Sequence, residues 1–141
     1  MNQQEIQQFL PHRPPMLLLD EVQATGAETA QGGYFVRGDE AFVQGHFPGN
    51  PVVPGVVLCE IIAQTAGVLV RDELQKGRTP LFVGIEGVRF RRMVKPGDAV
   101  RTTCRLLRKA GSLIRITGEA TVEDEVCCKG EFLLMLTQPE A

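Results

Sequence analysis

The segment from Gly55 to about Lys76 restricts the fold more than any other part of the sequence. Good helix formers fill it and Gly77 provides a stop signal after it, so it is predicted to form the only long helix. This helix is apolar on nearly all sides, and such a helix has to be buried on nearly all sides. The rest of the chain, alone or together with a second subunit, must therefore surround it.

The sequence after this helix has the pattern of an antiparallel sheet. Ile114, Ile116 and Val122 share one face of a predicted strand whose other face is polar. Turn-forming residues separate four such runs at hairpin-like spacings. The four expected strands are Leu81–Phe90, Ala99–Leu107, Leu113–Val122 and Glu125–Leu136.

The sequence before the helix predicts three shorter elements. They are a polar helix around Gln3–Phe9, a strand over Met16–Val22 and a strand over Glu28–Val36. The pair Gly32-Gly33 suggests a bulge or a sharp bend in the last of these strands. One apolar helix beside five or six antiparallel strands gives an α+β fold in which the sheet curls around the helix.

Length and composition suit one domain spanning residues 1–141, with 43% hydrophobic and 23% charged residues. The net charge of -2 argues against a general affinity for nucleic acid or for anionic membranes. Pro51–Val70 is apolar, but Glu60 and Gln64 near its centre argue against a transmembrane span. The N-terminus has no secretory signal pattern, so the expected compartment is the cytoplasm.

The cysteines are predicted to be reduced and mostly buried, because their spacing does not fit a metal site. We expect neither a metal nor a cofactor. Cys59 adjoins Glu60, but its side chain points about a third of a turn away, which favours core packing over nucleophilic catalysis. The four cysteines are Cys59, Cys104, Cys127 and Cys128.

Glu60 is a carboxylate within the apolar part of the predicted helix. Burial of an unpaired carboxylate is costly and favours its protonated form, which is the state that a general acid needs. Gln64, Gly67 and Arg71 follow it on the same helix face. This narrow polar stripe is either a solvent-facing side or a seam lining a cleft, and its width favours the cleft. Gln64 could then orient the carboxyl group.

The loop before the helix adds a candidate base and a candidate anion site. His46 lies between Gly45 and Phe47-Pro48, which hold the backbone, and an imidazole exchanges protons near neutral pH. The first N–H groups of the helix, after Pro54-Gly55, have no intrahelical partners and could bind an anion. A Pro-Gly pair before a helix is, however, often only a turn that marks where the helix begins. A base, an acid and N–H donors together suit proton removal beside a thioester or ketone carbonyl, with loss of a β-leaving group.

Three ordered motifs resemble the β-hydroxyacyl-acyl carrier protein dehydratases of bacterial fatty acid synthesis, and the resemblance covers almost the whole chain. The motifs are Leu10-Pro11-His12-Arg13-Pro14-Pro15 with Leu17-Leu18-Leu19-Asp20; Gly45-His46-Phe47-Pro48-Gly49 with Pro51-Val52-Val53-Pro54-Gly55-Val56, Glu60 and Ala63-Gln64; and Gly84-Ile85-Glu86 through Arg89-Phe90-Arg91 with Val94-Lys95-Pro96-Gly97-Asp98. Glutamate at position 60 resembles the branch that only dehydrates, because the dehydratase-isomerase branch carries aspartate there.

The resemblance implies a hot-dog fold and a homodimer with shared active sites, commonly as a trimer of dimers. It implies that His46 takes the α-proton of a (3R)-hydroxyacyl thioester and that Glu60 of the other subunit protonates or binds the departing hydroxyl. The N–H of Gly55 or Val56 would hold the thioester oxygen. The product would be a trans-2-enoyl thioester on the acyl carrier protein.

A basic cluster is a candidate docking surface for that acidic carrier protein, and a solvated strand end is the alternative. Its residues are Arg89, Arg91, Arg92 and Lys95. His12 and Arg13 are expected to anchor the N-terminal segment. Two other functions remain open from the residues: a hot-dog thioesterase that uses water as the nucleophile, and a non-enzymatic acyl-chain binding module.

Overall fold

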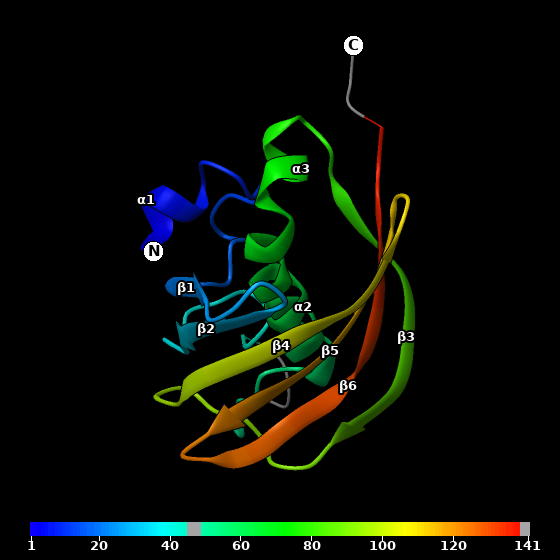
Figure 1. The fold of residues 1–141 in the computed structure, drawn as a ribbon. Helices are drawn as coiled ribbons and strands as arrows, with labels where there is room; N and C mark the ends of the chain where they lie inside the picture. The colour runs from blue at the N-terminus through cyan, green and yellow to red at the C-terminus, as the bar shows by residue number, and fades with distance from the viewer. Residues whose placement is uncertain (45–48, 139–141) are drawn as a thin grey trace.

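The computed structural model describes residues 1–44 and 49–138, and its elements form one curved sheet around a central helix (Figure 1). The helical segments are α1 (Gln3–Ile6), α2 (Gly55–Ala66), η1 (Gly67–Val70) and α3 (Arg71–Gln75). The strands are β1 (Glu21–Ala24), β2 (Thr29–Phe35), β3 (Pro80–Phe90), β4 (Ala99–Ala110), β5 (Leu113–Val122) and β6 (Glu125–Leu136).

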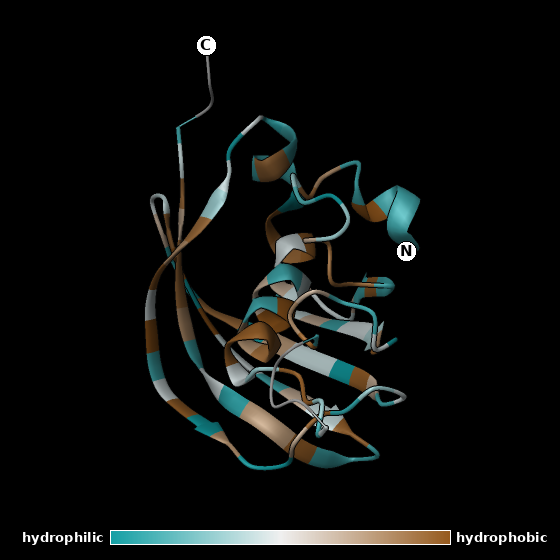
Figure 2. Cartoon of the chain, turned by 180° about the vertical axis from the view of Figure 1, so that it is seen from behind, coloured by the Kyte–Doolittle hydropathy of each residue, from teal (hydrophilic) through white to brown (hydrophobic). Residues whose placement is uncertain are grey.

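The sheet has six antiparallel strands in the order β1-β2-β4-β5-β6-β3. Its concave side covers α2, whose apolar residues lie inside the curve of the strands (Figure 2). Strand β5 shows the predicted alternation, since Ile114, Ile116 and Val122 are buried in the core. The α+β hot-dog architecture is confirmed, and all but the first turn of α2 is largely buried.

The prediction of one uninterrupted helix from Gly55 to Lys76 is wrong, because the 3-10 turn η1 separates α2 from α3. The interruption begins at Gly67, where a Cβ atom would lie 2.6 Å from Cδ2 of Leu10. Intrinsic helix preference does not separate the two segments, because α2 also begins with a glycine and contains two valines. The close contact of Gly67 with Leu10 is the feature that accompanies the change to 3-10 geometry. The predicted stop at Gly77 is confirmed, since its φ is +87°.

The predicted strand Met16–Val22 is also wrong, because β1 begins at Glu21. The N–H groups of Met16 and Leu17 donate to the Arg13 carbonyl oxygen, so this stretch turns back on itself. The N–H of Leu18 donates to the side chain of Gln64. Backbone groups that a strand would use in a ladder are therefore used in a turn and in a contact with α2.

The bulge expected at Gly32-Gly33 is absent from the described register, which runs without a shift through both pairings of β2. Gly32 serves close packing instead. A Cβ atom there would lie 2.7 Å from Oγ1 of both Thr65 and Thr102, whose hydroxyl groups bond each other at 2.6 Å. The missing side chain lets α2 approach β2 and β4 closely.

Strand β3 pairs with β6 and leaves its other edge unpaired by any described strand, although its spacing to β4 resembled a hairpin. Among the four strands β3 to β6, the β4-β5 and β5-β6 connections are hairpins, and the earlier β1-β2 connection is one as well. The β3 edge exposes Leu81, Val83 and Ile85. No helix within the described ranges is long and apolar enough to cross a membrane.

Candidate active site

Helix α2 places Glu60 and Gln64 one turn apart on the face that meets the N-terminal segment. Gln64 is only 2% exposed, and its amide group is fully engaged. Its Oε1 accepts from the N–H of Leu18 at 2.8 Å, and its Nε2 donates to the carbonyl oxygen of Met16 at 2.9 Å and to Oε2 of Glu60 at 3.0 Å. The polar stripe predicted on this helix is therefore not a broad side exposed to solvent. Its residue Gln64 is buried and orients the Glu60 carboxylate.

His12 meets the same carboxylate from the other side, which the sequence did not suggest. Its Nε2 lies 3.7 Å from Oε2 of Glu60, and the two side chains are 21% and 26% exposed. Burial lowers the pKa of His12 below its usual value, although the nearby Glu60 acts in the opposite direction. The surroundings of His12 therefore favour its neutral form.

Arg13 anchors the segment that carries His12, as predicted. Its guanidinium donates to the carbonyl oxygens of Leu10, His12 and Gln7 at 2.8 to 3.0 Å. These bonds join α1 to the turn that follows it. The position of His12 beside α2 thus depends on a local network as well as on core packing.

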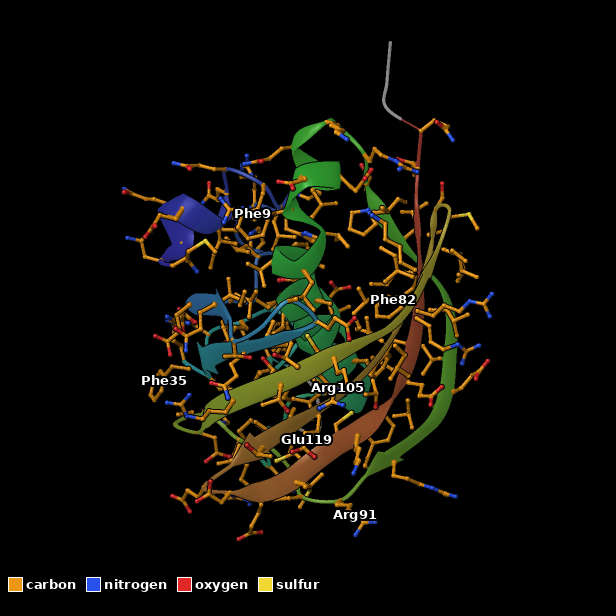
Figure 3. The ribbon with its side chains drawn as sticks, viewed as in Figure 1. Phe9, Phe35, Phe82, Arg91, Arg105 and Glu119 are labelled. Atoms are coloured by element: carbon orange, nitrogen blue, oxygen red, sulfur yellow. The ribbon has the colours of Figure 1, made fainter. Side chains whose placement is uncertain are left out.

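The carboxylate, the imidazole and the amide line a cavity of about 280 Å³ between α2, the N-terminal segment and the start of β3. The other lining residues are Leu10, Ala63, Thr79, Pro80, Leu81 and Phe82. Phe82 lies in the upper part of β3, and Arg91 lies beyond the lower end of this strand (Figure 3). A polar end with mostly apolar walls suits a ligand that joins a reacting group to a hydrocarbon chain.

The start of α2 lines a different cavity, of about 470 Å³, whose walls include Gly55, Val56 and Phe90. No side chain of the described ranges caps this helix end. The ring of Phe90 covers the α-carbon of Gly55, since a Cβ atom there would lie 2.6 Å from Cε1. In a single chain the candidate N–H donors and the Glu60 carboxylate are therefore not brought to one cavity.

The predicted base His46 lies outside the described residues. The predicted docking residues lie around the lower end of β3, where Arg89, Arg91 and Lys95 are exposed. Arg92 differs from them, because it is half-buried and donates to the Val122 carbonyl oxygen at 2.7 Å. Three of the four cations are thus free to meet a partner, and Arg92 serves the packing of its own chain.

All four cysteines are free and buried, as predicted. Cys59 Sγ lies 3.9 Å from Cys128 Sγ of β6, on the side of α2 that faces the sheet. Within the described ranges no group of His, Cys, Asp and Glu side chains has the arrangement of a metal site. The chemistry available at the cavity is proton transfer through Glu60 and polar orientation by its neighbours.

Comparisons with known proteins point to one family. A model of the FabA-like domain matches residues 10–131. The curated 3-hydroxyacyl-[acyl-carrier-protein] dehydratase FabZ of Petrotoga mobilis is 40% identical over 134 residues, which cover 95% of this chain and 96% of that protein. The FabZ of Bacillus pumilus is 43% identical over 134 residues, covering 94% and 93%.

Solved structures share the fold at lower identity. The dehydratase heterocomplex ApeI:P from Xenorhabdus doucetiae has a TM-score of 0.80 and 20% identity, with 94% of this chain and 91% of that chain covered. A putative thioesterase related to phenylacetic acid degradation, from Ralstonia eutropha, has a TM-score of 0.63 and 20% identity, with 82% and 83% covered. The fold alone therefore does not separate the two activities, but the curated relatives do: the chain belongs to the FabA-like family and, within it, to the FabZ-type 3-hydroxyacyl-[acyl-carrier-protein] dehydratases.

Proposed function

We propose that residues 1–141 act as a single dehydratase domain that converts (3R)-3-hydroxyacyl-[acyl-carrier-protein] to the trans-2-enoyl form in fatty acid biosynthesis. The observation that carries the proposal is the identity of 40% and 43% to curated dehydratases over nearly the whole chain. The Glu60 carboxylate, oriented by Gln64 at the polar end of a mostly apolar cavity, supports it.

The proposed reaction is an elimination. His46 removes the α-proton, and the electron pair of that C–H bond forms the new double bond. Glu60 gives its proton to the β-hydroxyl oxygen as the C–O bond breaks, so that water leaves. The N–H groups of Gly55 and Val56 would stabilise the charge on the thioester oxygen while the α-proton is removed. No cofactor is needed for this sequence of proton transfers.

We propose a homodimer in which His46 of one subunit faces Glu60 of the other, assembled further as a trimer of dimers. The apolar edge strand β3, with Leu81, Val83 and Ile85 exposed, supports contact with another copy. The separation of the Glu60 cavity from the start of α2 also fits a site that a single chain leaves incomplete.

The proposed macromolecular partner is the acyl carrier protein, in the cytoplasm. The exposed Arg89, Arg91 and Lys95 form a cationic surface that suits an acidic carrier. Arg92 was included in the predicted docking set, but its bond to Val122 gives it a role within the chain. Neither nucleic acid nor a membrane is part of the proposed activity.

The first test is turnover of crotonyl-[acyl-carrier-protein] and 3-hydroxybutyryl-[acyl-carrier-protein], with enoyl absorbance and free thiol followed together. Enoyl change without thiol release supports the dehydratase. Thiol release would establish the thioesterase alternative, and an acyl chain bound without turnover would establish the binding module. His46→Ala and Glu60→Gln should each lower kcat by about 10²- to 10⁴-fold, the usual contribution of a positioned acid or base. Full activity in either variant would contradict the assigned roles.

A further inference from the structure

Two polar groups converge on one oxygen of the Glu60 carboxylate. Gln64 donates to Oε2 at 3.0 Å, and Nε2 of His12 lies 3.7 Å from the same atom. Within residues 1–44 and 49–138 neither group forms a hydrogen bond with the other oxygen, Oε1. The two oxygens of the carboxylate are therefore unequal before any substrate binds.

Both groups are held by the N-terminal segment. Gln64 is fixed by its bonds to the backbone of Met16 and Leu18, and His12 is fixed by the Arg13 network. A distance of 3.7 Å is longer than a hydrogen bond, but a small rotation of either side chain would close it. Bonds of catalytic groups are often long before substrate binds.

We infer that His12 is a positioning residue for Glu60: its Nε2–H and the Gln64 amide hold Oε2, so that Oε1 carries the proton that goes to the substrate hydroxyl. Two donors at Oε2 disfavour a proton there, because a protonated oxygen would face two N–H groups. After transfer the same donors stabilise the carboxylate that remains. This inference rests on the proposed dehydration.

Few charged groups surround His12 and Glu60. The described lining of the cavity contains two ionisable side chains, His12 and Glu60, because the lining residues at the start of β3 and just before it are uncharged. Arg13, on the N-terminal segment, lowers the pKa of His12, and Glu60 raises it. In the proposed dimer the partner's His46 would be the additional titrating group.

The contact can be tested without turnover by recording the imidazole ¹H–¹⁵N spectrum of the intact protein. The chain has two histidines, so His12→Gln assigns the remaining signals to His46. We expect His12 to be neutral with the proton on Nε2 at pH 7.5. Replacing Glu60 with Gln should lower the pKa of His12, because the carboxylate that raises it is gone. An unchanged His12 titration would overturn the contact.

The consequence for catalysis is tested by three variants in steady-state dehydration of 3-hydroxybutyryl-[acyl-carrier-protein]. His12→Ala should lower kcat by about 10- to 100-fold with little change in KM, as expected when a catalytic group loses its alignment. His12→Gln, which keeps an N–H donor, should restore most of that loss. Arg13→Gln is the comparison for loosening of the segment, because it removes the bonds that fix His12 but keeps the imidazole itself.

The outcomes separate the inference from the function on which it depends. If His12→Ala keeps full kcat while Glu60→Gln loses it, the dehydration mechanism stands and the positioning role is overturned. If His12→Gln is as impaired as His12→Ala, the donor role is overturned as well. If Glu60→Gln keeps full activity, the proposed acid itself is wrong, whatever the spectra of His12 show.

Discussion

Replacing Gln64 with Leu tests how α2 is joined to the N-terminal segment. The side chain is 2% exposed and supplies the acceptor for the N–H of Leu18, which is itself buried. The Met16 carbonyl oxygen loses its donor as well, in a residue that is 56% exposed. The variant therefore leaves one buried donor unsatisfied, which costs about 1–3 kcal/mol.

A loss of about 2 kcal/mol should lower Tm by roughly 6 °C in a domain of this size. The variant also removes the donor to Oε2 of Glu60, so kcat should fall by about 10- to 100-fold. Thermal unfolding and turnover are to be measured at one protomer concentration, because assembly makes Tm concentration-dependent.

Thr65→Val is the matched control on the same helix. Its hydroxyl is buried and bonds Thr102 at 2.6 Å, on the side of α2 that faces β4. We expect a comparable loss of stability, of about 1–2 kcal/mol, with kcat retained. The reasoning is refuted if Gln64→Leu leaves Tm unchanged, or if Thr65→Val lowers kcat as strongly as Gln64→Leu does.

Three further predictions concern pH, packing and the carrier. Burial lowers the pKa of His12, so the unfolded chain binds a proton at this imidazole more tightly than the folded chain does. The free energy of unfolding should therefore fall as pH drops through about 6.5. In Tm measurements, His12→Gln should weaken this dependence on pH. Gly118→Ala should cost about 1–3 kcal/mol in urea unfolding, because its methyl group would collide with Ile62. Arg91→Glu should raise KM for carrier-bound substrate in a salt-dependent way, whereas Arg105→Glu, exposed on β4, should not.

Alternation and turn residues predicted the sheet best where pairing is local. The bounds of β5 and β6 agree with the predictions, because consecutive hairpins make sequence neighbours into spatial neighbours. The pairing of β3 with β6 was not predictable in this way, since β4 and β5 separate the two strands in the sequence. The errors at Met16–Val22 and Gly67 have the same kind of cause, because a tertiary contact overrides the local conformational preference in each case. The contact is with Gln64 of α2 in the first case and with Leu10 in the second.

The candidate site was predictable to the extent that helix geometry decides it. A spacing of four residues places Gln64 beside Glu60, and the hydrogen bond between them is present. His12 could not be placed there from its neighbours in sequence, because tertiary packing alone brings the N-terminal segment against α2. The only sequence signal for His12 as a site residue was the rarity of histidine, since the chain has two. The roles of His46, Gly55 and Val56 stay predictions.

The strand order has a consequence for how the chain is made. Strand β3 is synthesised before β4, β5 and β6, yet its partner in the sheet is the last of them. On the ribosome, α2 emerges with its apolar sides uncovered, and the edge formed by β3 cannot be closed until β6 has followed. Such non-local pairing slows folding and leaves a nascent chain open to aggregation. We therefore expect the yield of folded protein to depend on chaperone capacity and on translation rate more than on the stability of the finished fold.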